Sequence, residues 1–169
     1  MGKYKLVMEK FTVDGGLDTT EIESLRDEMQ EWVDNMGGTA LENTSRYQMA
    51  EEAVSQLDRV DEVNFEDIWD AVSRTECLTS LTEDLKNLEY EVGVFKVKSR
   101  RRSPSRAYRL SNAISAISGA IECLREFLET HEGDQPHESD KIREVRTAID
   151  EVESTVQEFE NVEFPGMYG

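Results

Sequence analysis

Three stretches of the chain place apolar residues alternately three and four positions apart, and this spacing constrains the fold more than any other feature. The stripes are Leu78, Leu81, Leu85, Leu88, Val92 and Phe95, then Leu110, Ile114, Ile117, Ile121, Leu124 and Leu128, then Ile142, Val145, Ile149, Val152, Val156 and Phe159. An apolar residue about every 3.5 positions keeps one side of a helix against its neighbours. Because the turn-rich connections are short, neighbouring helices are expected to be antiparallel. The sequence therefore predicts an all-α protein with an antiparallel, coiled-coil-like three-helix bundle.

The N-terminal part has a different pattern. Tyr4, Leu6 and Met8 alternate, which predicts one short strand or extended arm, but no second convincing strand is available to pair with it. Helical apolar spacing then runs from Thr20 to Met36. A second helical pattern, for which Asn43, Thr44 and Ser45 are alternative caps, places Tyr47, Ala50, Val54 and Leu57 on one face, so the two segments predict an N-terminal helical hairpin.

The expected division is therefore an N-terminal arm and helical hairpin over residues 1–62, and a helical bundle with a basic tip and a C-terminal tail over residues 63–169.

Charge is segregated along the chain. Residues 96–109 hold seven of the 19 Lys and Arg residues and none of the 37 Asp and Glu residues, in a chain of net charge −18. The seven are Lys96, Lys98, Arg100, Arg101, Arg102, Arg106 and Arg109. Segregated charge creates a field that a partner can recognise, so these residues are the candidate partner-binding site, at one tip of the bundle. Helix-terminal electrostatics explain only some of them, because Arg106 and Arg109 fall at a helix start, where cations are disfavoured.

Nucleic acid is the second partner class that this basic segment suggests. The acidic remainder should be repelled by phosphates, and Tyr108 is the aromatic residue of the segment available to stack on a base. The predicted helical hairpin is instead densely acidic, through Asp18, Glu21, Glu23, Asp27, Glu28, Glu31 and Asp34. This face is either a solvated surface or a mimic of DNA phosphates.

One acidic pattern suggests an enzyme. Glu51-Glu52 and Asp67-x-x-Asp70 resemble the motifs of MazG-like all-α nucleotide pyrophosphohydrolases, which hold Mg²⁺ with Glu-Glu-x-x-Glu and Glu-x-x-Asp. Ser55 stands where the third glutamate would be, and a hard cation needs several converging oxygens. The resemblance implies a Mg²⁺-dependent nucleotide hydrolase as an alternative. No catalytic residue, cofactor or metal site is predicted.

The two cysteines and two histidines give no motif. Cys77 and Cys123 are expected to be reduced thiols, although antiparallel helices would bring them close enough to leave pairing open. His131 and His137 share a loop with several carboxylates, but spacing along a loop does not establish metal-ligand geometry. Without a membrane-length apolar run or a signal-peptide core, a cytoplasmic location is expected.

Residues 23–39, residues 41–53 and the ending Glu163-Phe-Pro-Gly-Met-Tyr-Gly resemble segments of small acidic proteins from phages and related mobile elements. The resemblance implies an origin and transfers no residue role. Small phage proteins often bind host machinery. The leading expectation is a non-catalytic acidic interaction protein, a phage-encoded inhibitor or adaptor that binds a host or defence protein. Homo-oligomerisation of the basic tip on an acidic face is a further alternative.

Overall fold

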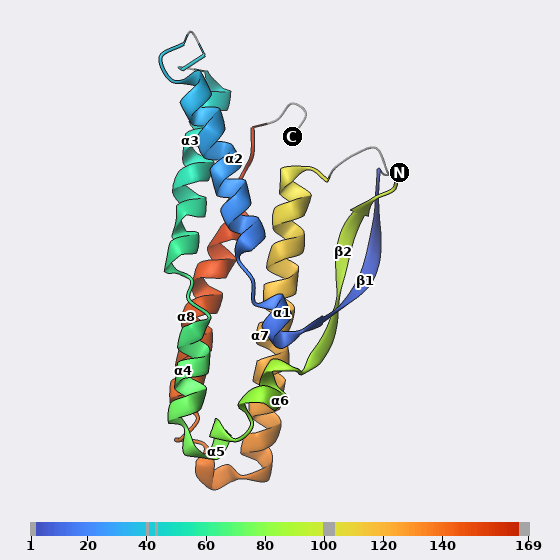
Figure 1. Cartoon of the computed structure of the whole chain (residues 1–169), viewed down its shortest axis with the longest axis vertical. Helices are drawn as coiled ribbons and strands as arrows, with labels where there is room; N and C mark the ends of the chain where they lie inside the picture. The colour runs from blue at the N-terminus through green and yellow to red at the C-terminus, as the bar shows by residue number, and fades with distance from the viewer. Residues whose placement is uncertain (1–2, 40, 43, 100–103, 166–169) are drawn as a thin grey trace.

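The computed structural model describes residues 3–39, 41–42, 44–99 and 104–165, which form a mostly helical, elongated molecule (Figure 1). The elements are β1 (Tyr4–Thr12), α1 (Val13–Gly16), α2 (Thr20–Met36), α3 (Ser45–Leu57), α4 (Glu66–Arg74), α5 (Glu76–Thr79), α6 (Thr82–Lys86), β2 (Glu89–Val97), α7 (Arg106–Asp134) and α8 (Arg143–Glu158), with 3₁₀ turns η1 (Asp58–Glu62), η2 (Pro136–Glu138) and η3 (Phe159–Asn161). None of the described helices has the length and apolar character needed to cross a bilayer.

The predicted N-terminal helical hairpin is present as α2 and α3. Gly37 caps the end of α2, and the Thr44 hydroxyl accepts a hydrogen bond from the Tyr47 amide at the start of α3. In Figure 1, α4 continues on the side of the molecule on which α3 lies, and α8 runs beside α4.

Two of the three predicted bundle helices are also confirmed. α7 and α8 run antiparallel and join at the bottom of Figure 1 through η2. Their apolar stripes are buried along the length of both helices, from Leu110 to Leu128 in α7 and from Val145 to Val156 in α8. The spacing of about 3.5 residues therefore identified the sides of these helices that pack together.

The prediction that residues 78–95 form one continuous helix of the bundle is wrong. Its stripe divides into the short helices α5 and α6, which bury Leu78 and Leu85, and the strand β2. β2 pairs antiparallel with β1 in a register that runs from Tyr4 opposite Val97 to Thr12 opposite Glu89. The chain is mostly helical, as expected, but a three-helix bundle is not confirmed. The predicted N-terminal strand is present, and the prediction that it lacks a partner strand is wrong.

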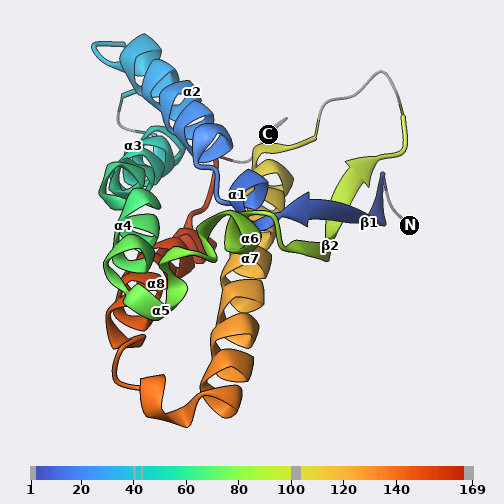
Figure 2. The ribbon, with the colours of Figure 1, turned by 60° about the horizontal axis from the view of Figure 1, so that its bottom comes forward.

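The β1–β2 pair, called the ribbon from here on, extends beside the N-terminal half of α7 (Figure 2). The Tyr90 hydroxyl donates a hydrogen bond to the backbone oxygen of Ala116 on α7. The approach is close at Gly119, where an added Cβ would lie 2.6 Å from Cγ1 of Val92 and 2.5 Å from the Tyr90 ring. A residue without a side chain at this position therefore lets the ribbon lie against the helix.

The hydrophobic core cluster contains residues from both sides of the predicted boundary after residue 62, including Leu25, Leu57, Ile117 and Ile149. The division into two domains stays a prediction.

Candidate functional site

The described residues of the predicted basic site lie at the join between β2 and α7, not between two helices. Lys96 is in β2 and Lys98 follows it, while Arg106 and Arg109 are in the first turns of α7. Arg100, Arg101 and Arg102 lie outside the described residues. Ser105 caps α7 by accepting a hydrogen bond from the Tyr108 amide.

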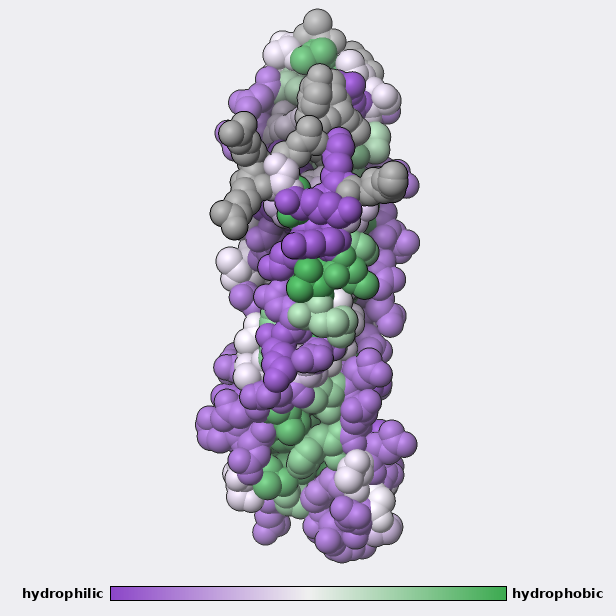
Figure 3. All heavy atoms as spheres, turned by 90° about the vertical axis from the view of Figure 1, so that its right-hand side faces the viewer, coloured by the Kyte–Doolittle hydropathy of each residue, from purple (hydrophilic) through white to green (hydrophobic). Residues whose placement is uncertain are grey.

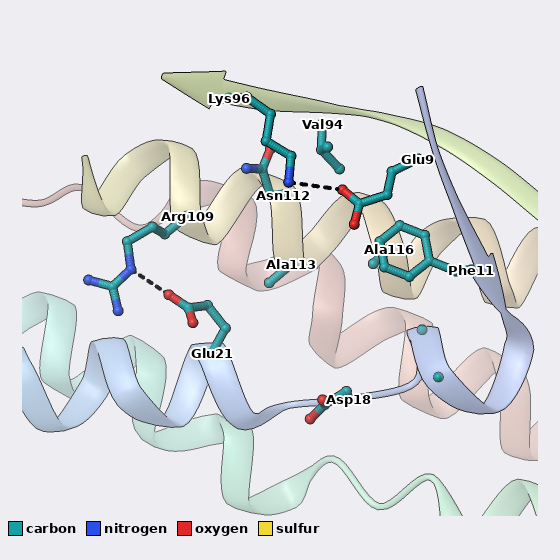
Figure 4. Close-up of a pocket in the computed structure, with 12 residues that line it drawn as sticks. Glu9, Phe11, Asp18, Glu21, Val94, Lys96, Arg109, Asn112, Ala113 and Ala116 are labelled. Atoms are coloured by element: carbon teal, nitrogen blue, oxygen red, sulfur yellow. Dashed lines mark hydrogen bonds and ion pairs between the residues drawn. The ribbon is translucent and has the colours of Figure 1, made fainter. Parts of the chain in front are cut away.

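Arg106 and Arg109 are turned toward α2, where acidic residues hold them. Nε of Arg106 lies 3.0 Å from Oε1 of Glu28, and Nη2 of Arg109 lies 2.6 Å from Oε2 of the same carboxylate. Arg109 also pairs with Glu21 through Nε (Figure 4). These hydrogen bonds, of which the one from Arg109 has the largest effect, hold the pKa of Glu28 below its usual value. The two arginines therefore join α7 to α2, and two acids of the suggested DNA-mimicking face are occupied within the chain.

A pocket of about 290 Å³ opens between the ribbon, α1, the start of α2 and α7 (Figure 4). Its charged lining is paired: Nζ of Lys96 lies 3.4 Å from a Glu9 oxygen, and Arg109 binds Glu21. Asp18 accepts a hydrogen bond from the Thr20 amide. The volume falls just under the usual small-molecule range of roughly 300–1,000 Å³, and a charged ligand would have to displace internal ion pairs. The pocket therefore does not favour a small-molecule site.

The carboxylates suggested for Mg²⁺ are exposed and lie on successive helices. Glu51 and Glu52 are in α3, whereas Asp67 and Asp70 are in α4, beyond η1. Asp67 accepts a hydrogen bond from the Asn64 side chain at 3.3 Å. In the described part of the chain, none of these four belongs to a group of three converging metal-ligand atoms. The arrangement gives the predicted Mg²⁺ site no support.

Among the residues that the structure describes, the most exposed large apolar side chains lie on the outer surface of the ribbon. Leu6 is 62% exposed and Met8 60%, and both lie on β1. Gly93 of β2 is opposite Met8, and the Leu6 side chain lies over it. Lys5 and Lys10, also exposed, flank the pair on the strand. Figure 3 views the molecule from this side, where apolar residues form patches between hydrophilic ones.

The two edges of the ribbon differ. At the outer edge of β2, the Asn112 side chain accepts a hydrogen bond from the Phe95 amide at 2.8 Å and donates one to the Phe95 carbonyl at 2.9 Å. Asn112 therefore fills the place that a neighbouring strand would take. At the outer edge of β1, no third strand pairs with it within the described residues. An unpaired strand edge presents backbone donors and acceptors to an incoming extended segment.

A second cluster lies at the opposite end of the molecule, where α5, the end of α7 and η2 meet. Nε2 of His131 lies 2.5 Å from Oε2 of Glu138, and the thiol of Cys77 completes a group whose ligand atoms all lie within 4.8 Å of one another. His131 lowers the pKa of Glu138, whereas burial, followed by the hydrogen bond with Glu138, raises the pKa of Cys77. His131 and Cys77 are far apart in the sequence, and no sequence pattern connects them.

Both cysteines are free thiols. Cys123 lies on α7, with Sγ 4.0 Å from the Glu89 carbonyl oxygen. The disulfide that was left open is therefore not formed.

Comparison of the chain with known protein families, with curated proteins and with solved structures finds no match.

Proposed function

We propose that this chain is a non-catalytic interaction protein that binds a partner protein through the ribbon. In this proposal the partner lays an extended segment along the outer edge of β1 and covers Leu6 and Met8. The observation that carries the proposal is the exposure of these two side chains, 62% and 60%, on a strand whose outer edge has no described partner.

The chemistry of the surface specifies the partner segment. Leu6 and Met8 are suited to apolar side chains at alternate positions, since residues two apart share a face of a strand. Lys5 and Lys10 favour Asp or Glu on the partner, because exposed opposite charges set orientation and speed encounter. Burial of a whole large apolar side chain contributes roughly 1.5–3 kcal/mol, so the backbone hydrogen bonds of strand addition have to supply further affinity.

The ribbon is held in place before any partner binds. The hydroxyl of Tyr90 and the amide of Asn112 connect β2 to α7, and Tyr4 of β1 stacks on Tyr108 with ring centroids 3.9 Å apart. A fixed surface loses less conformational entropy on binding than a mobile arm would lose.

A protein partner is better supported than nucleic acid. Arg106 and Arg109 of the basic segment are neutralised by Glu28 and Glu21, which leaves fewer charges for phosphates. The internal use of those acids likewise weakens DNA mimicry by this face. A phage inhibitor or adaptor acting in the host cytoplasm stays part of the proposal, and it rests on the sequence resemblance alone.

The test is selection of peptides from a displayed random library on the purified chain. We expect enriched sequences that alternate apolar residues with Asp or Glu, and we expect amide chemical shifts to move along β1 when such a peptide is added. The Leu6→Lys/Met8→Lys variant should lose the binding. Leu41→Lys is the matched control, because Leu41 is also exposed, at 55%, and lies between α2 and α3.

Equal binding by the double variant, or shifts that map away from the ribbon, would contradict the proposal. A second copy of the chain is the alternative occupant. Light scattering tests it: a dimer joined through the ribbon should be lost in the Leu6→Lys/Met8→Lys variant, whereas association of the basic tip with an acidic face should weaken as salt screens the charges.

A further inference from the structure

We propose that Cys77, His131 and Glu138 bind one divalent transition-metal ion of the zinc type. The site lies at the lower end of the molecule in Figure 1, where α5 meets the turn between α7 and α8. It is separate from the ribbon and does not depend on the proposed function.

The donor set selects the class of metal. One thiolate, one imidazole nitrogen and one carboxylate oxygen are the ligand types of zinc sites. Mg²⁺ and Ca²⁺ prefer oxygen ligands, so this cluster does not suit them. Three protein ligands leave one position of a tetrahedral site for water.

The distances are within the reach of small side-chain rotations. The three ligand atoms already lie within 4.8 Å of one another without an ion. Metal–ligand bonds of about 2.0–2.3 Å in a tetrahedron place ligand atoms roughly 3.3–3.7 Å apart. The 2.5 Å contact between His131 and Glu138 therefore has to lengthen by under about 1 Å when the ion enters between them. Both of these side chains are only 16% exposed, so their positions are restricted.

Neighbouring contacts orient the ligands. The His131 ring stacks on Phe127, with centroids 6.4 Å apart. Glu132, the residue after His131, accepts hydrogen bonds from Ser139 and from Arg146 of α8, and these bonds close the loop that carries Glu138. In metal sites, such supporting contacts fix the orientation of the side chains that bind the ion.

The ion would join three elements, of which α5 is distant in sequence from the other two. Cys77 belongs to α5, His131 to the last turn of α7 and Glu138 to η2. Each metal–ligand bond adds a cross-link that is absent from the unfolded chain, so the ion should stabilise this end of the molecule.

The experiment is titration of the reduced full-length chain with Co²⁺, in excess Mg²⁺ to occupy the exposed carboxylates. A site containing Cys77 should give a thiolate-to-cobalt charge-transfer band in the near ultraviolet and the visible bands of tetrahedral Co²⁺. One equivalent of Zn²⁺ should displace the Co²⁺ and raise the thermal unfolding midpoint. Cys77→Ser should abolish the charge-transfer band, and His131→Gln should abolish the tetrahedral spectrum.

Two matched controls test the assignment. Cys123→Ser removes the other cysteine, and His137→Gln removes the neighbouring histidine, whose side chain is 69% exposed. Both should keep the bands. The proposal is overturned if the wild-type chain gives no tetrahedral spectrum, if Cys77→Ser keeps the charge-transfer band, or if either control loses it. In the first case the three side chains form a hydrogen-bonded cluster only.

Discussion

Replacement of Gly119 by alanine tests how closely the ribbon packs on α7. The added Cβ would lie 2.5 Å from Cε2 of Tyr90 and 2.6 Å from Cγ1 of Val92. Ordinary carbon contacts are about 3.5–4.0 Å, so both contacts are about 1 Å too short. Tyr90 cannot move away without losing the hydrogen bond between its hydroxyl and Ala116. Overpacking of this kind costs roughly 1–3 kcal/mol, here toward the upper end, whereas alanine in place of glycine favours a helix by about 1 kcal/mol. We expect a net loss of about 1–2 kcal/mol in the free energy of unfolding.

Urea unfolding followed by far-ultraviolet circular dichroism measures this loss. Gly133→Ala is the matched control, because Gly133 is also in α7 and an added Cβ there would meet no atom within 4 Å. The control should be neutral or stabilising by up to about 0.5 kcal/mol, since the residue is in the last turn of the helix. If Gly119→Ala were as stable as Gly133→Ala, the close contact between the ribbon and α7 would be refuted.

Three further predictions follow from the contacts of α7, α2 and the ribbon. Asn112→Asp keeps the acceptor for the Phe95 amide but places a carboxylate against the Phe95 carbonyl, so a loss of about 1 kcal/mol and roughly fivefold faster hydrogen exchange of that amide are expected. Because arginines lower the pKa of Glu28 in the folded chain, its contribution to stability is present above its unfolded pKa, near 4.5, and is lost as pH falls through the folded pKa. Glu28→Gln should therefore destabilise the chain by about 1 kcal/mol at pH 7 and reduce the loss of stability on acidification, as measured by urea titrations at several pH values. Glu31→Gln, at an exposed position on the same helix, is the control and should change neither the stability at pH 7 nor its dependence on pH. Substitution of the two exposed ribbon residues by lysine should change the free energy of unfolding, measured by urea titration, by less than about 0.5 kcal/mol, and a larger loss would show that they pack within the chain.

The elements that can be predicted from the sequence are those whose apolar pattern is long and fits only one kind of secondary structure. α7 and α8 show helical apolar spacing over many turns, and no short strand pattern competes with it. Residues 89–97 were misassigned because nine residues are too few to separate the two periods: Val92 and Phe95 fit a helix, while Tyr90, Val92 and Val94 fit a strand. The strand partner is near the start of the chain, so no local signal marked the pairing.

The site residues show the same limit. The cluster of basic residues can be read from the sequence, but the pairing of its arginines with acidic residues cannot. Glu28 and Arg109 are 81 residues apart, and they meet only because α2 packs against α7 with these side chains facing each other. Cys77 and His131 meet for a similar reason, through packing of α5 against the end of α7. The exposure of Leu6 and Met8 could not be predicted, because β2, the strand that pairs with β1, was not recognised in the sequence.

The register of the ribbon also sets an order of folding. Tyr4 pairs with Val97, so β1 has to wait until more than half of the chain has left the ribosome before its partner strand exists. The closure entropy of such a long loop makes this pairing slower than the local contacts of α2 with α3, which are complete in the first part of the chain to be synthesised. During that interval Leu6 and Met8 belong to an unpaired extended segment, the kind of segment that aggregates or recruits chaperones. A bulky tag fused to the N-terminus would lie directly beside the strand that joins the structure last.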